Sequence, residues 1–156
     1  MKLNTASAAV RFAKQLEDDS RQLYERVSER YPEWQSALAP LIRENKRNVG
    51  SIDRAYIGVV SDALDTQFAF EGIDTDDYRL VTDLPDLPAQ VAAVLAANEE
   101  TIIAFYRAAA DSSRDLLADV PRAFDRIASK RSRRAEALGA LTHARKFPVS
   151  EIHRTK

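Results

Sequence analysis

Apolar residues recur along this chain every three or four positions in four separate segments. The segments span residues 5–29, 32–67, 88–110 and 121–144. In each one the apolar residues fall mainly on one face and charged residues occupy the rest, as expected of an amphipathic helix that packs on a shared core. Pro40, early in the second segment, is expected to kink that helix or to mark its true start. The pattern therefore predicts an all-α protein built from four helices.

The connections between these segments differ in length. Residues 30–32 and 111–120 are the short first and third connections, whereas residues 68–87 separate the second and third segments. This longer stretch exceeds a tight turn, and we expect a short helix within it at residues 76–81. Short, long and short connections are typical of a four-helix bundle with one long crossover, which is the pattern of ferritin-like folds.

An internal repeat relates the first and third segments. Glu17 precedes Tyr24 by seven residues, and Glu99 precedes Tyr106 by the same interval, with an apolar residue directly before each tyrosine. Apolar positions of the second and fourth segments can also be superimposed. We therefore interpret the chain as two related helical hairpins.

Composition narrows the class of protein. The 156 residues are enough for one hydrophobic core, so we expect one domain at residues 1–146 and a polar tail at residues 147–156. The chain has no cysteine, which excludes disulfides, iron–sulfur clusters and cysteine-ligated zinc. Its formal net charge is −1, and no apolar run approaches the roughly 20 residues of a membrane span. We expect a cytoplasmic protein that binds neither membrane nor nucleic acid.

Residues 16–27 and 98–106 resemble the first and third helices of the rubrerythrin branch of the ferritin-like superfamily, and the resemblance covers residues 5–145. In that family the bundle holds two iron ions. Helices one and three each supply a Glu, and helices two and four each supply a Glu-x-x-His motif. Glu17 and Glu99 match the ligands of helices one and three. The resemblance therefore implies a ferritin-like bundle with these two carboxylates inside it.

The two Glu-x-x-His motifs are absent. The positions that the apolar register assigns to them carry amide and guanidinium groups: Asn45 and Asn48 in the second segment, Arg131 and Arg134 in the fourth. A shift of one residue would place Glu44 and Arg47 at the positions of the second segment. The chain's histidines, His143 and His153, both lie near its end. The resemblance thus implies a degenerate di-iron site.

This pattern leads to a hypothesis for the core. An unpaired buried carboxylate is costly, whereas arginine stays charged and can hold a carboxylate through two hydrogen bonds. We therefore expect a polar network at the former metal-site positions, with two tyrosines nearby: Glu17, Asn45, Asn48, Glu99, Arg131 and Arg134, beside Tyr24 and Tyr106. In the alternative interpretation the carboxylates reach water and the arginines belong to a solvated basic face. Arg126, Lys130 and Arg133 lie off the inward stripe and are expected to be solvated in either case.

These features favour a non-catalytic interaction or regulatory protein that has no cofactor, forms a homodimer and binds a protein partner of unknown identity. One alternative is an atypical rubrerythrin-like oxidoreductase. In that case Glu17, Glu44 and Glu99 would bind iron or manganese, helped by a histidine from the tail of a neighbouring subunit. Another alternative is a small-anion or nucleic-acid binder that uses the basic stretch of the fourth helix. No Gly-rich phosphate loop, nucleophile motif or zinc signature occurs in the sequence.

Overall fold

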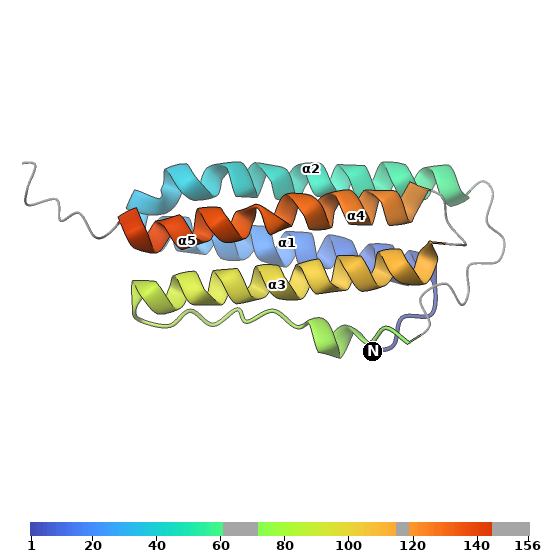
Figure 1. Ribbon diagram of the computed structural model, residues 1–156, viewed down its shortest axis with the longest axis horizontal. Coiled ribbons are helices and arrows are strands. Elements are labelled where there is room, and N and C mark those ends of the chain that lie inside the picture. The colour runs from blue at the N-terminus through green and yellow to red at the C-terminus, as the bar shows by residue number, and fades with distance from the viewer. Residues whose placement is uncertain (61–71, 115–118, 145–156) are drawn as a thin grey trace, which may run out of the picture.

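The computed structural model describes residues 1–60, 72–114 and 119–144, and within these ranges the protein is all-helical. The elements, in chain order, are α1 (Ala6–Arg30), η1 (Pro32–Trp34), α2 (Gln35–Val60), η2 (Thr75–Tyr78), α3 (Pro88–Ser113), α4 (Asp119–Ser132) and α5 (Arg134–Ala144). Figure 1 shows four long rods side by side, the fourth formed by α4 and α5 in line. None of the described helices is long and apolar enough to cross a membrane.

The direction of the rods is visible in Figure 1. α1 and α2 run in opposite directions, whereas α2 and α3 run in the same direction, because residues 72–87 return along the length of the bundle before α3 begins. Side chains of α1 and α3 hold this returning segment. Arg26 donates to the carbonyl of Thr82 at 2.6 Å, and Asn98 exchanges two hydrogen bonds of 2.9 Å with the backbone of Val81.

Local chemistry explains where the helices begin. The Thr5 side chain accepts a hydrogen bond from the amide of Ala8 and caps the start of α1. Pro32 and Pro88 occupy the first positions of η1 and α3, where a missing amide hydrogen costs nothing. Pro40 lies inside α2 and therefore does not mark its start. The first and third helices lie close to their predicted ranges. Residues 61–67 of the predicted second helix and the predicted tail at residues 147–156 lie outside the described residues.

Two predicted elements were wrong in detail. The fourth helix is not continuous, because the amide of Arg133 donates to the carbonyl of Lys130, a bond across three residues that tightens the turn and separates α4 from α5. The short helix expected at residues 76–81 is instead η2. The side chain of Asp74 caps it early by accepting from the amide of Asp76, and Val81 cannot extend it because its backbone is bound to Asn98.

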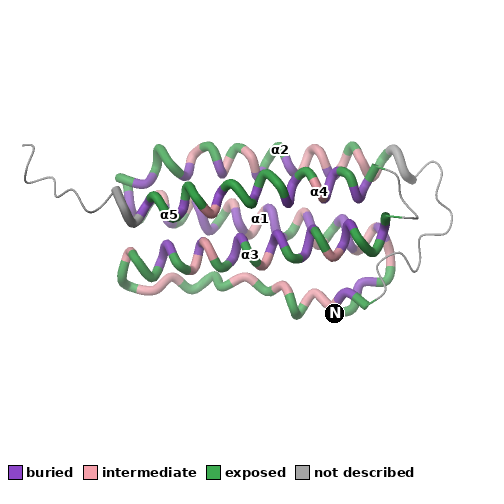
Figure 2. The backbone as a smooth tube through the Cα atoms, in the orientation of Figure 1, coloured by how far each residue is buried: buried purple, intermediate pink, exposed green. Residues whose placement is uncertain are grey.

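The interior consists of two apolar clusters with a polar layer between them. One cluster includes Leu16, Ile102 and Phe124, and the other includes Leu23, Leu95 and Leu138. Along every rod, the buried residues between the two clusters are polar. Figure 2 shows that buried positions recur along the rods and alternate with exposed ones.

Candidate functional site

The polar layer collects one or two buried polar residues from each rod. α1 supplies Glu17 and Ser20, and α3 supplies Glu99. The other two rods supply two residues each: Asn45 and Asn48 from α2, and Arg131 and Arg134 from the junction of α4 and α5. Every one of these residues is buried, and both Glu17 and Glu99 have no exposed surface. The structure therefore brings together all six residues assigned to former metal-site positions.

Arg131 stands at the centre of this layer. Its Nε and Nη2 donate to the two carboxylate oxygens of Glu17 at 3.1 and 2.8 Å, which is a paired, fork-like contact. Its Nη1 donates to both oxygens of Glu99 at 2.7 Å. One guanidinium thus neutralises carboxylates from two different helices while having no exposed surface itself.

Arg134 joins the layer to its edge. Its Nη1 lies 3.3 Å from Glu99 Oε1, and its Nε and Nη2 donate to Glu44 Oε1 at 3.2 and 3.0 Å. A further bond of 3.3 Å reaches the carbonyl of Leu41. The Glu44 side chain retains 27% of its surface exposed, whereas that of Arg134 retains 1%. Arg134 therefore links the closed core to a carboxylate that contacts solvent.

Tyr24 and Tyr106 form a reciprocal pair of hydrogen bonds between α1 and α3. Tyr106 of α3 donates to Glu17 Oε1 at 2.7 Å, and Tyr24 of α1 donates to Glu99 Oε1. Because α1 and α3 run in opposite directions, the same seven-residue interval in each helix places each glutamate beside the other helix's tyrosine. The internal repeat of the sequence thus becomes a local two-fold relation in space.

The asparagines complete the layer. Asn48 Nδ2 donates to Glu17 Oε2 at 3.3 Å, and Asn45 Oδ1 accepts from Arg131 Nη2 at 3.3 Å. Asn45 Nδ2 also lies 3.4 Å from Ser20 Oγ. The buried Asn48 Oδ1 has no hydrogen-bond partner within the described part of the chain. The buried carboxylates and guanidiniums of the layer, in contrast, form hydrogen bonds with one another.

Electrostatics keeps the layer in one protonation state. Burial opposes ionisation of Glu99, but the charges of Arg131 and Arg134 outweigh it and lower the pKa of Glu99 below its ordinary value. Burial also opposes the charged form of Arg131, yet Glu17 and Glu99 hold the pKa of this guanidinium well above its usual range. Burial, reinforced by the neighbouring glutamates, raises the pKa of Tyr24 and of Tyr106. At neutral pH the layer holds an ionised Glu99, a charged Arg131 and neutral tyrosines.

Guanidinium groups separate the three carboxylates of the alternative metal site, Glu17, Glu44 and Glu99. Among the side chains that the structure describes, no group of three or more His, Asp or Glu residues comes together in a way that could hold a metal ion. Arg131 bridges Glu17 and Glu99, and Arg134 bridges Glu99 and Glu44, so guanidiniums occupy the positions between these carboxylates. Hard divalent ions prefer oxygen and imidazole ligands, and two guanidiniums add positive charge where a cation would have to bind.

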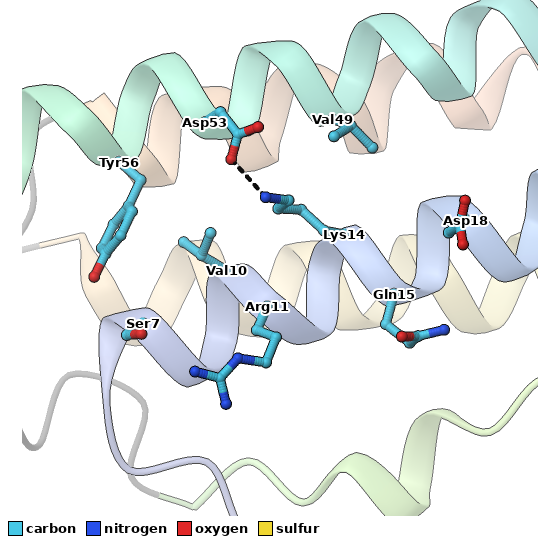
Figure 3. Close-up of a pocket in the computed structure, with 9 residues that line it drawn as sticks. All are labelled: Ser7, Val10, Arg11, Lys14, Gln15, Asp18, Val49, Asp53 and Tyr56. Atoms are coloured by element: carbon cyan, nitrogen blue, oxygen red, sulfur yellow. Dashed lines mark hydrogen bonds and ion pairs between the residues drawn. The ribbon is translucent and has the colours of Figure 1, made fainter.

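Some hollows of the surface lie away from this layer, and others reach its edges. A hollow of about 560 Å³ lies between α1 and α2, where Lys14 Nζ and Asp53 Oδ1 form an ion pair of 2.8 Å (Figure 3). A smaller neighbouring hollow, of about 260 Å³, is lined in part by Glu17 and Asn45. Both of these residues are nevertheless buried to 1% exposure or less, so the layer stays closed to solvent.

The residues of the layer were predictable to different degrees. The apolar register placed the six principal residues inward, and the alternative shift is excluded because Arg47 is exposed. Arg126, Lys130 and Arg133 are exposed, as predicted. The contact between Glu44 and Arg134 was missed, although Glu44 lies directly before Asn45 and could have been recognised as a residue at the stripe's edge.

Comparison of the chain with family models, with curated proteins and with solved structures gave no match. The class that the structure defines by itself is an all-helical bundle with a buried, charge-paired polar layer.

Proposed function

We propose that this protein is a non-catalytic, ferritin-like bundle of the rubrerythrin-related kind, which acts as an interaction or regulatory module rather than as an oxidoreductase. The observation that carries the proposal is the Arg131 guanidinium, which bridges Glu17 and Glu99 with no exposed surface. In the family that the sequence resembles, metal ions would bind between these two carboxylates. Here that position holds a permanent organic cation.

The course of the chain supports the ferritin-like part of the proposal. α2 and α3 run in the same direction, and the described residues 72–87 return along the bundle between them (Figure 1). A four-helix bundle with one long crossover has this arrangement, whereas four helices joined by short loops alternate in direction.

The contacts of the layer support the non-catalytic part. Binding a metal would require both glutamates to give up their charge-assisted hydrogen bonds to Arg131, which are among the stronger hydrogen bonds in proteins. The displaced guanidinium would then remain buried without a partner, at a cost of several kcal/mol. The tyrosines are held in their neutral form by burial and are occupied as donors to the glutamates.

Metal analysis of the purified protein tests the proposal directly. After expression with added iron and manganese, followed by dialysis, we expect both metals far below one equivalent per chain. Iron or manganese near one or two equivalents, retained through dialysis, would overturn the non-catalytic proposal.

A gain-of-metal variant tests the correspondence with the family separately. Asn45→Glu, Asn48→His, Arg131→Glu and Arg134→His together would restore the two Glu-x-x-His motifs at the positions that the register assigns to them. We expect this variant to bind Fe²⁺ in a ratio near two per chain. A matched variant that also carries Glu17→Ala should bind less. If the restored variant folds, as judged by circular dichroism, but takes up no iron, the ferritin-like correspondence is wrong.

Homodimer formation stays a prediction, which light scattering on the purified protein checks.

A further inference from the structure

A separate concavity lies between α2 and α4. It encloses about 270 Å³ and is lined by Ser51, Arg54 and Ala55 of α2 and by Asp119, Arg122 and Arg126 of α4. We call it the arginine hollow. Three guanidinium side chains from two helices therefore line one small surface depression, and none of them belongs to the polar layer.

The charge of the arginine hollow is not balanced. Nowhere in the described ranges does Arg54, Arg122 or Arg126 form an ion pair. The acids nearest to them along the chain are engaged elsewhere: Asp53 pairs with Lys14, and Asp125 pairs with Arg114. Asp119 is the single acid in the lining. Three guanidiniums and one carboxylate leave two positive charges in a depression that the net charge of −1 would not suggest.

The guanidinium of Arg54 lies close to Gly50, one turn earlier in α2. A Cβ atom at Gly50 would lie 3.3 Å from Arg54 Nη1, so the missing side chain lets the guanidinium lie back along α2. There Arg54 Nη2 donates to Ser51 Oγ at 3.3 Å. The hydroxyl accepts this bond, which leaves its own hydrogen available as a donor to a ligand. Beside the depression, Gly50 thus leaves room for the Arg54 guanidinium, and Ser51 accepts a hydrogen bond from it.

We propose that the arginine hollow binds the phosphate group of a small phosphate-bearing molecule. The planar fork of a guanidinium matches two phosphate oxygens, and charge-assisted bonds of this kind are about twice as strong as neutral ones. Counted over the described residues, the two excess positive charges would balance the two negative charges of a phosphate dianion. The larger hollow between α1 and α2 does not have this property, because two carboxylates, Asp18 and Asp53, balance the two cations of its lining, Arg11 and Lys14.

Calorimetric titration of the full chain with inorganic phosphate, in a buffer without other multivalent anions, tests the proposal. We expect saturable binding of one phosphate per chain. Arg122→Gln and Arg126→Gln should each raise the dissociation constant for phosphate by about tenfold or more, since each removes a charge-assisted contact. The matched control is Arg133→Gln, which removes an exposed arginine that lies outside the hollow, between α4 and α5, and should change the constant by less than about twofold.

Two further titrations separate the possible sources of the phosphate. Tighter binding of phenyl phosphate than of inorganic phosphate would assign the hollow to a phosphate ester, and the reverse order would assign it to free phosphate; either result supports the proposal. Absence of saturable binding at millimolar phosphate would overturn it, as would equal weakening by Arg133→Gln. Binding of poly-glutamate that phosphate does not compete away would also overturn it, because the face would then fit an acidic protein segment. All these readouts are independent of the polar layer and of metal content.

Discussion

At the scale of single residues, the protein depends on one buried cation. Arg131 is the only residue of the polar layer that contacts both fully buried carboxylates and an asparagine of α2 among the described residues. A buried ion pair is weak evidence for stability as a whole, because desolvation offsets much of the attraction. Loss of one partner, however, leaves a buried charge without compensation. Removal of Arg131 should therefore cost much more than its presence contributes.

We expect Arg131→Met to lower the free energy of unfolding by about 3–5 kcal/mol, because two buried carboxylates lose their shared partner. Arg133→Met, two positions away and exposed, should change it by no more than about 0.5 kcal/mol. Urea denaturation of both variants at neutral pH measures the difference. Similar small effects at the two positions would mean that the layer is solvated and that the account of the core is wrong.

The pH dependence of stability follows from Glu99. Its pKa is lowered in the folded protein from an ordinary value of 4.5, so the folded state binds this proton less readily than the unfolded chain does. The resulting stability is fully present above pH 4.5 and is lost as the pH falls through the folded pKa. Glu99→Gln should be less stable than the wild type at neutral pH by about 1–3 kcal/mol.

The same variant should also lose less stability than the wild type on acidification, because it lacks the titrating group. Denaturation at neutral pH and at several values below 4.5 makes the comparison. Glu100→Gln, at the neighbouring exposed position of α3, is the control and should leave the wild-type acid profile unchanged. Parallel acid profiles for Glu99→Gln and the wild type would contradict the ionised state of Glu99.

At the scale of elements, the helices are set by caps, prolines and glycines as much as by apolar stripes. Gly139 lies within α5, and a Cβ there would meet nothing within 4 Å, whereas Gly72 has a φ of 94° in the segment before η2. A glycine in a helix interior costs backbone entropy without need, but a glycine at positive φ avoids a steric penalty that other residues incur. Chemically identical substitutions at these two positions should therefore act in opposite directions.

Gly139→Ala should raise the free energy of unfolding by about 0.5–1 kcal/mol. Gly72→Ala should lower it by about 1–2 kcal/mol, because alanine would have to adopt a left-handed conformation there. Thermal and urea denaturation of the two variants check the signs. Stabilisation by Gly72→Ala would mean that the backbone at this position does not require positive φ in solution.

At the scale of the whole molecule, the polar layer divides one hydrophobic interior into two clusters. Such a layer specifies how the rods are aligned, since sliding one helix along another would bury glutamates and arginines among apolar side chains. The polar layer also reduces the apolar surface that the core buries, and its charged groups lose their hydration. Removing the entire network should therefore be better tolerated than removing part of it.

A combined variant tests this expectation: Glu17→Met, Glu99→Met and Arg131→Met, with Tyr24→Phe and Tyr106→Phe to remove the hydroxyls that lose their acceptors. We expect it to be more stable than Arg131→Met alone by about 2 kcal/mol or more, because no buried carboxylate remains unpaired. Urea denaturation followed by both circular dichroism and tryptophan fluorescence measures this, and shows whether the transition stays cooperative. A combined variant less stable than Arg131→Met would mean that the pairs stabilise the fold beyond their desolvation cost.

The sequence by itself predicted four amphipathic helical segments and, as one of two interpretations, the inward position of the residues assigned to the layer. Helix periodicity is a local property, so the spacing of Leu16, Glu17 and Ser20, or of Ile127, Arg131 and Arg134, already indicates which side chains share a face. The Glu–Tyr repeat was likewise visible as two intervals of seven residues. The pairing of opposite charges inside the bundle was a hypothesis, which rested on the cost of burying an unpaired charge.

Only the tertiary structure decided which partner each of these groups has. One arginine serves both buried glutamates, the other reaches Glu44 at the edge, and the tyrosines bond across α1 and α3 rather than within a hairpin. The convergence of Arg54 with Arg122 and Arg126 also depends on how α2 lies against α4. The physical reason is that the rotation and axial offset between two packed helices are set by the contacts of all the side chains between them. A pattern along a single helix does not contain that information.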